Sequence, residues 1–292
     1  MTFRLRCGNL MKKAKLIRLK MAGNIYIGEI LENEEIQEDY FLMKVKMAPL
    51  FENPSPGQFV MIRIAGLNDP FLSRPISIYA FSRGKNYCTM ELLYRVMGKG
   101  TQILAGLIKG SQVEINGPLG NGFETRSVKK NIVFISGGIG IAPLALLMEG
   151  LRRRTDCSSS AMIIYPGFQS ASAVVGLDKM QKFCRDIAVC TDDGTLGEKG
   201  LVTRIFQKDM KKFTPENTSI YACGPKAMLK ALAKILNKNK FDCQVSLEER
   251  MACGTGACVA CAVAVKDEKG ALAYKRVCAD GPVFNLADII WE

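Results

Sequence analysis

Short apolar runs broken by turn residues fill the first third of the chain after position 24. The runs fall at residues 25–30, 40–46, 59–64, 76–81, 89–96 and 112–116, and none has a helix-length period. Several short strands separated by turn signals are typical of a small antiparallel barrel. The pattern therefore predicts a β-barrel domain over residues 23–126.

The apolar pattern changes beyond residue 131. A buried strand at 132–136 leads through glycines into a helical stretch at 144–153. The elements that follow are strands at 161–165, 186–190 and 219–222, alternating with helices at 173–183, 202–208 and 226–238. Alternating strands and helices form a parallel sheet with crossover helices. Residues 127–243 are therefore predicted to be an α/β domain.

Four cysteines dominate the end of the chain. Cys253, Cys258 and Cys261 are followed after sixteen residues by Cys278, which is the spacing of plant-type [2Fe-2S] ligands. The loop between the first three is built of small residues, so backbone N–H groups can approach the cluster sulfurs. The spacing predicts an iron-sulfur site.

The interval before the fourth cysteine predicts a hairpin. Strands at 262–265 and 271–277 flank an Asp-Glu-Lys-Gly turn, so the chain would return to the cluster loop. Residues 244–292 are then a small [2Fe-2S] domain, too short to fold without its metal.

Other cysteine chemistries fit less well. A four-thiolate zinc site usually presents two C-x2-C pairs on separate knuckles, and this spacing is asymmetric. Disulfides are a weaker alternative, because eleven cysteines are an odd number and the chain is neither short nor visibly secreted. A Rieske centre is excluded because the chain contains no His.

The net charge of +12 is mostly a property of the N-terminal tail. Residues 1–20 contain seven Lys or Arg and no acid, and without them the balance is 33 minus 28, or +5. We therefore expect a basic tail over residues 1–22 and no nucleic-acid partner. The longest apolar run, 132–148, is short for a membrane span and contains glycines and a proline. No membrane anchor or export signal is evident, and the remaining cysteines fit a reducing cytoplasm.

Glycines mark the ends of two predicted parallel strands. Gly137, Gly138 and Gly140 stand between a strand and a helix, where glycines let the backbone approach a pyrophosphate. Gly224 and Pro225 follow a later strand, at the edge of the sheet where ligands bind. Tight packing of the turns would explain both groups equally well.

Asp192 and Asp193 end another strand on the same edge, and no Arg cluster follows the earlier strands. A carboxylate at this position favours the ribose hydroxyls of NAD over the 2′-phosphate of NADP.

The barrel carries a second candidate ligand site. Arg74, Pro75, Ile76 and Ser77 place a cation and a hydroxyl together, which suits a phosphate and a ring nitrogen. An exposed Arg on a strand is the alternative. The turn of residues 98–101 would cradle a phosphate or simply connect two strands.

These motifs occur in an order that resembles the ferredoxin-NADP reductase superfamily. The lead Leu-Glu-Glu-Arg-Met into Cys253, and the Val-Cys-Ala-Asp-Gly-Pro-Val-Phe sequence around Cys278, resemble the electron-transfer subunits of class B dihydroorotate dehydrogenase. The resemblance implies NAD over the α/β domain, with Cys223 near the nicotinamide. It places Ser77 beside the flavin N5 edge, and it implies FAD contacts along the barrel at Arg74, Pro75, Ile76, Ser77, Leu93, Tyr94, Arg95, Gly100 and Thr101. The superfamily often has Tyr where this chain has Ile76.

The resemblance also implies a function and a partner. Electrons would pass from an FMN-bearing dihydroorotate dehydrogenase catalytic subunit through [2Fe-2S] and FAD to NAD+, in pyrimidine biosynthesis. Two copies of each subunit would form a heterotetramer. A subunit of a ferredoxin-linked NAD(P) oxidoreductase or of a sulfhydrogenase is the alternative, and a zinc-stabilised binding module is a third.

Overall fold

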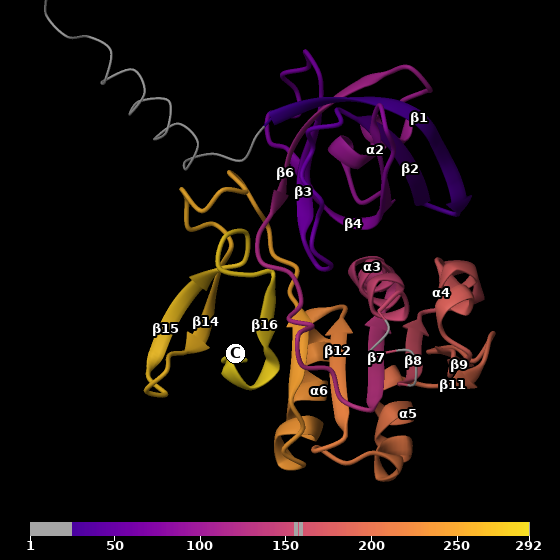
Figure 1. The fold of residues 1–292 in the computed structure, drawn as a ribbon, viewed down its shortest axis with the longest axis vertical. Coiled ribbons are helices and arrows are strands. Elements are labelled where there is room, and N and C mark those ends of the chain that lie inside the picture. The colour runs from indigo at the N-terminus through magenta and orange to yellow at the C-terminus, as the bar shows by residue number, and fades with distance from the viewer. Residues whose placement is uncertain (1–24, 155–156, 158–159, 292) are drawn as a thin grey trace, which may run out of the picture.

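A computed structural model describes residues 25–154, 157 and 160–291, so the predicted basic tail lies outside the described residues. Six antiparallel strands close into a barrel in the order β1-β2-β5-β4-β3-β6, which confirms the predicted antiparallel β-barrel (Figure 1). Alternate residues such as Met43, Val45 and Leu92 fill its interior and are fully buried. The strands are β1 (Ile25–Gln37), β2 (Tyr40–Met47), β3 (Phe59–Ile64), β4 (Arg74–Arg83), β5 (Cys88–Arg95) and β6 (Gln112–Leu119).

A short helix that the apolar pattern did not predict, α2 (Lys99–Ala105), lies between β5 and β6. Its beginning is held by the Thr101 hydroxyl, which accepts the backbone N–H groups of Met97 and Gly98. Its end is held by Asn33, whose side-chain amide donates to the carbonyls of Leu104 and Leu107, both at 2.9 Å. These contacts stabilise a helix too short to show a period of its own.

The second domain is a twisted sheet in the order β11-β10-β8-β7-β12-β13-β16, with β9 paired to β8. Every pairing is parallel except that of β13 with β16, which confirms the predicted parallel sheet. The strands are β7 (Asn131–Gly137), β8 (Ala161–Phe168), β9 (Asp186–Ile187), β10 (Cys190–Thr191), β11 (Glu198–Lys199), β12 (Thr218–Cys223), β13 (Cys243–Ser246) and β16 (Val283–Asn285).

Helices cover both faces of this sheet, and α3 lies between the sheet and the barrel (Figure 1). The predicted helix at 173–183 begins only at Leu177, because Gly176 before it has φ +69°. The predicted strand at 186–190 is split into β9 and β10, which pair with β8 on either side of Pro166, a residue without an N–H. The helices are α3 (Ile141–Arg152), α4 (Leu177–Phe183), α5 (Val202–Asp209) and α6 (Lys226–Lys238).

The C-terminal segment is attached to this sheet. The predicted hairpin forms as β14 (Ala262–Lys266) and β15 (Leu272–Arg276), while β16 pairs with β13 at the sheet edge. The predicted boundary between residues 243 and 244 falls inside β13. Among the described residues, no helix is long and apolar enough to cross a membrane.

Candidate functional site

One cavity of about 480 Å³ is bordered by all three parts of the molecule, a volume typical of a small-molecule site. The α/β domain contributes Ile139 and Ala142, beside the glycine turn. The C-terminal segment contributes Pro282 and residues 246–251, which end two positions before Cys253. The barrel contributes Phe59, Arg74, Pro75, Ile76, Ser77, Leu93, Tyr94, Arg95, Met97 and Thr101.

The cavity wall includes eight of the nine barrel residues that sequence reasoning assigned to FAD. The ninth, Gly100, lies behind Arg74, and a Cβ at Gly100 would overlap the Arg74 guanidinium. Gly100 therefore lets the guanidinium pack against α2. The Thr101 hydroxyl is already used in capping that helix, so Thr101 offers the cavity its methyl group more readily than its oxygen.

Arg95 carries a buried donor that its own chain does not satisfy. Its Nε has no hydrogen-bond partner within the described part of the chain, while its Cζ lies 5.3 Å from the centroid of the Tyr40 ring. A buried unpaired donor costs about 1–3 kcal/mol. An acceptor group of a bound ligand would remove that cost, and the positive charges of Arg74 and Arg95 suit an anionic cofactor such as FAD.

Aromatic side chains reach the cavity from positions other than Ile76. The Tyr94 hydroxyl donates to Asn33 Oδ1 at 3.0 Å, and burial raises its pKa above the ordinary value. Because the hydroxyl is engaged, Tyr94 presents its ring to the cavity, as does Phe59. Ile76 itself is buried and adds an aliphatic surface.

The glycines of the nucleotide turns have two different roles. A Cβ at Gly137 would lie 2.8 Å from Pro225 Cδ, and one at Gly140 would overlap the Cys223 carbonyl oxygen. A Cβ at Gly224 would come within 2.9 Å of the Gly137 backbone nitrogen. These three glycines allow the turns after β7 and β12 to pack together, so the packing alternative holds for them.

Gly138 differs, because nothing lies within 4 Å of its Cβ position and its φ is +51°. Its backbone is left accessible to a ligand at the carboxyl edge of the sheet. Asp192 is exposed just after β10 on the same edge, where its backbone N–H donates to Phe168 O at 3.0 Å. The structure thus brings the predicted NAD residues to one edge.

Cys223 does not line the cavity, although it ends β12 beside it. Its thiol is fully buried, and burial raises its pKa well above the ordinary value, so it stays protonated at neutral pH. Ser246, its neighbour on β13, hydrogen-bonds the thiol and does line the cavity. Sequence reasoning missed Ser246 and the wall of residues 246–251, whose only signal was the Leu-Glu-Glu-Arg-Met lead into Cys253.

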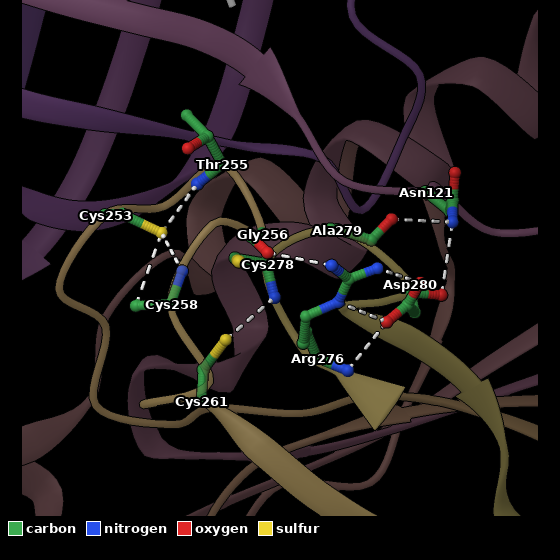
Figure 2. A network of polar contacts seen from close by, with 10 residues as sticks. All are labelled: Asn121, Cys253, Thr255, Gly256, Cys258, Cys261, Arg276, Cys278, Ala279 and Asp280. Carbon is green, nitrogen blue, oxygen red and sulfur yellow. Dashed lines mark hydrogen bonds and ion pairs between the residues drawn. The ribbon is translucent and has the colours of Figure 1, made fainter. Parts of the chain in front are cut away.

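The four predicted cluster ligands lie together as two pairs (Figure 2). The thiol of Cys258 donates to Cys253 Sγ at 3.3 Å. The backbone N–H of Cys278 donates to Cys261 Sγ at 3.4 Å, and their side chains also hydrogen-bond. Among the described residues no group of three or more His, Cys, Asp or Glu is placed to hold one metal ion. Two thiolate pairs fit a two-iron cluster better than a single tetrahedral zinc.

Backbone donors surround the first pair. Burial alone would raise the pKa of Cys253, but N–H groups of Cys258 and Thr255, each 3.4 Å from its Sγ, lower that pKa to about 6. Burial, followed by the neighbouring Cys261, raises the pKa of Cys278 to about 12. N–H groups aimed at a ligand sulfur are the contacts that stabilise a negatively charged cluster.

The cluster loop rests directly on the barrel. Gly254 has φ +69°, and a Cβ there would overlap the side chain of Met61 on β3. Met251, two residues before Cys253, lines the cavity. One continuous segment, residues 246–261, therefore lines the cavity, contacts the barrel and carries three of the four predicted cluster ligands.

Comparison with known families agrees with this arrangement. Residues 248–290 match the iron-sulfur cluster binding domain of dihydroorotate dehydrogenase B. Residues 134–234 match the oxidoreductase NAD-binding domain. The two matches coincide with the cysteine segment and with the sheet that carries the glycine turns.

Curated relatives extend over most of the chain. The dihydroorotate dehydrogenase B (NAD(+)) electron transfer subunit of Caldanaerobacter subterraneus subsp. tengcongensis is 39% identical, covering 90% of this chain and 97% of the relative. The subunit of Fusobacterium nucleatum is also 39% identical, covering 88% and 95%. That of Clostridium acetobutylicum is 33% identical, covering 90% and 96%.

Solved structures share the architecture. The NADH-dependent reduced ferredoxin-NADP oxidoreductase matches with a TM-score of 0.73 at 26% identity, covering 90% of each chain. A ferredoxin NADP+ reductase from Neisseria gonorrhoeae, solved with FAD and NADP, has a TM-score of 0.63 at 15% identity, covering 74% of this chain and 91% of that chain. The second likeness shows the fold alone. Identity is higher to the curated subunits than to either oxidoreductase, which favours the first predicted function over its alternative.

Proposed function

Because this chain belongs to the family of dihydroorotate dehydrogenase B electron transfer subunits, we propose that it carries electrons from a catalytic subunit through [2Fe-2S] and FAD to NAD+ in pyrimidine biosynthesis. The observation that carries the proposal is the cavity shared by barrel, glycine turn and cysteine segment. A bound flavin exchanges a hydride with nicotinamide and single electrons with an iron-sulfur centre. A flavin site bordered by the other two sites fits that chemistry.

The barrel residues would hold FAD in this cavity. Arg74 and Arg95 neutralise the pyrophosphate, and the cofactor satisfies the Arg95 Nε. Ser77 lines the cavity from β4, where its hydroxyl would contact the flavin N5 edge. Phe59 and Tyr94 supply the ring surfaces.

The sheet edge would hold NAD. The accessible backbone at Gly138 receives the pyrophosphate, and Asp192 accepts a ribose hydroxyl. Gly224 and Pro225 fix the turn after β12 against the glycine turn. Cys223, a protonated thiol, acts as a neutral wall behind Ser246 and neither donates nor accepts a proton at neutral pH.

The face around the cluster loop would receive the catalytic subunit. Val259 is 74% exposed, and Tyr274 on β15 is 69% exposed. Exposed apolar side chains beside a redox centre suit a protein contact. The partner there is an FMN-bearing dihydroorotate dehydrogenase, two copies of each subunit making a heterotetramer.

The experiment that tests this function uses the purified chain with and without its partner. The chain alone should show flavin and iron-sulfur absorption, oxidise NADH with dyes and leave dihydroorotate untouched. Coexpression with the catalytic subunit should give NAD+-dependent orotate formation, which Val259→Glu should weaken and Ile108→Glu, a change of an equally exposed residue beyond α2, should not. Dihydroorotate turnover by the single chain would contradict the proposal.

A further inference from the structure

Arg276 joins the cluster loop to the turn that carries the fourth cysteine (Figure 2). It ends β15, two residues before Cys278. Its Nη1 donates to the carbonyl of Gly256, between Cys253 and Cys258, at 2.8 Å. A Cβ at Gly256 would lie only 3.3 Å from that Nη1, so the guanidinium is in contact with the loop.

Asp280 holds the other side of the guanidinium. Its Oδ2 accepts a hydrogen bond from Arg276 Nε at 2.9 Å, and its Oδ1 accepts one from Arg276 Nη2 at 3.1 Å. The same carboxylate accepts the backbone N–H of Arg276 at 2.8 Å. Both side chains are partly shielded, with 40% and 33% of their surfaces exposed. A two-point pair of this kind fixes the orientation of the guanidinium.

The pair also connects the cluster to the barrel. The side-chain amide of Asn121, which follows β6, donates to the carbonyls of Ala279 at 3.3 Å and Asp280 at 3.1 Å. The Asn121 backbone N–H donates to Gly281 O at 2.5 Å. The turn carrying Cys278 is therefore anchored on one side to the flavin domain and on the other to the cluster loop.

Charge so close to a redox centre acts on its potential. Arg keeps its proton at every accessible pH, and its contact with Gly256 places the positive charge beside the loop, with the Asp280 carboxylate on the opposite side of the guanidinium (Figure 2). One-electron reduction adds one negative charge to a [2Fe-2S] centre. A nearby cation stabilises the reduced form and a nearby anion the oxidised form.

We propose that Arg276 is a positioning residue whose positive charge raises the reduction potential of the cluster. Asp280 partly offsets this effect and orients the Arg276 guanidinium. The inference rests on the proposed function in one respect, that the four thiolates hold an iron-sulfur cluster. The two charges act on the reduction potential in opposite directions. Arg276 favours electron entry from the partner, and Asp280 limits how tightly the cluster keeps that electron.

The opposite signs give a test that a purely structural role would not pass. Arg276→Gln should lower the potential and Asp280→Asn should raise it, each changing the one-electron equilibrium by about tenfold, or 59 mV. Arg276→Lys, which keeps the charge, should shift it less than Arg276→Gln. A pair that only braces the loop would move the potential in the same direction whichever member is removed.

The measurement is a redox titration of the full chain carrying FAD and cluster, followed by EPR of the reduced cluster and by visible absorption. Arg63→Gln is the matched control, because Arg63 forms a comparable pair with Glu114 on the barrel. Unchanged potentials in variants that retain their iron, or shifts of one sign in both, would overturn the proposal. If Arg276→Gln loses the cluster, the Asp280→Asn shift decides alone. Zinc in place of iron in the unaltered chain would instead refute the proposed function.

Discussion

Two joins hold this molecule together, and they are built differently. The barrel meets the α/β domain through buried side chains, with Tyr79 and Leu93 sharing one apolar core with Ile141 and Leu144 of α3. The cysteine segment also buries side chains, since Val277 and Phe284 lie in one core with Met61 of the barrel, but its turn at residues 279–281 is joined to the barrel through backbone, as where Asn121 hydrogen-bonds Gly281. Side chains can repack around a substitution, whereas backbone atoms in direct contact cannot make room for added atoms. The two joins should therefore respond differently to mutation.

The largest effect should follow removal of one cluster ligand. Cys258→Ser breaks the first thiolate pair, so the iron content should fall from about two per chain toward zero. The barrel closes without help from the cysteine segment, so FAD should remain. Iron and sulfide analysis beside the flavin spectrum checks both parts, and Cys243→Ser, a change of a buried cysteine on β13, is the control. Stoichiometric zinc without iron in anaerobically purified wild-type chain would contradict the assignment.

The backbone join should fail when one glycine gains a methyl group. A Cβ at Gly120, after β6, would lie 2.5 Å from Gly281 O and 2.6 Å from Pro282 Cδ. Gly120→Ala should therefore cost more than about 3 kcal/mol and release the cluster at lower denaturant concentration. The measurement is cluster absorbance during guanidinium titration.

Gly270 provides the control for that prediction. It has φ +80°, close to the +73° of Gly120, yet nothing lies within 4 Å of its Cβ position. Gly270→Ala should cost only the strain of a left-handed alanine, about 1–2 kcal/mol. Equal losses in the two variants would show that backbone strain, and not the join, decides the outcome.

The cavity between the joins should depend on charge. Arg74→Ala removes a charge-assisted contact worth about 1.5–3 kcal/mol, so the Kd for FAD should rise roughly 10–100-fold. Fluorescence titration of the apoprotein measures it. Arg63→Ala, on the same barrel but outside the cavity wall, should leave the Kd unchanged. Unaltered FAD affinity in Arg74→Ala would show that Arg74 has a structural role and does not contact FAD.

Sequence predicted the elements that have an apolar period of their own and missed those that depend on distant contacts. Strands and helices with a clear apolar period, such as β2 and α6, were placed nearly to the residue because one face of each is buried. The helix α2 was missed because Asn33, more than seventy residues away in sequence, holds its end. The strands β13 and β16 were missed because their partners lie in other segments, and three or four residues show no period.

The candidate site divides in the same way. The cluster cysteines could be found because ligand spacing is a local property, and the structure pairs them as Cys253 with Cys258 and Cys261 with Cys278. The cavity wall at Ser246 could not, because it depends on how β13 lies beside β12. The roles of Gly137 and Gly140 were undecidable from sequence, since a close contact with Pro225 or Cys223 exists only in the folded chain.

The smallest effect should come from the side-chain join. Lys179 on α4 is only 13% exposed, donates to Tyr79 O at 3.2 Å, and lies 3.7 Å from Glu91 and 4.0 Å from Glu149. Burial lowers its pKa, against the opposing effect of both carboxylates, and Lys182 lowers it further. Lys179→Met should therefore cost less than about 1.5 kcal/mol, because losing the ion pairs is offset by no longer burying a charge.

The pH dependence gives this last prediction its sign. A folded pKa below the unfolded value of 10.5 means that the unfolded chain binds more protons in the window between them. Stability contributed by Lys179 then rises as the pH increases through that window. Denaturant unfolding at pH 7 and pH 10 should show that the free energy of unfolding of the wild type rises relative to that of Lys179→Met at the higher pH. Glu149 keeps Arg153 as a partner in the variant, and Glu91 loses its ion pair with Lys179 but remains 31% exposed to water, so neither carboxylate is left fully buried and unpaired. The prediction would be contradicted if Lys179→Met lowered the free energy of unfolding by more than about 3 kcal/mol, or if the variant became more stable relative to the wild type at pH 10. Either outcome would show that the contact between barrel and α/β domain depends on its charges as strictly as the contact of the cysteine segment depends on its backbone.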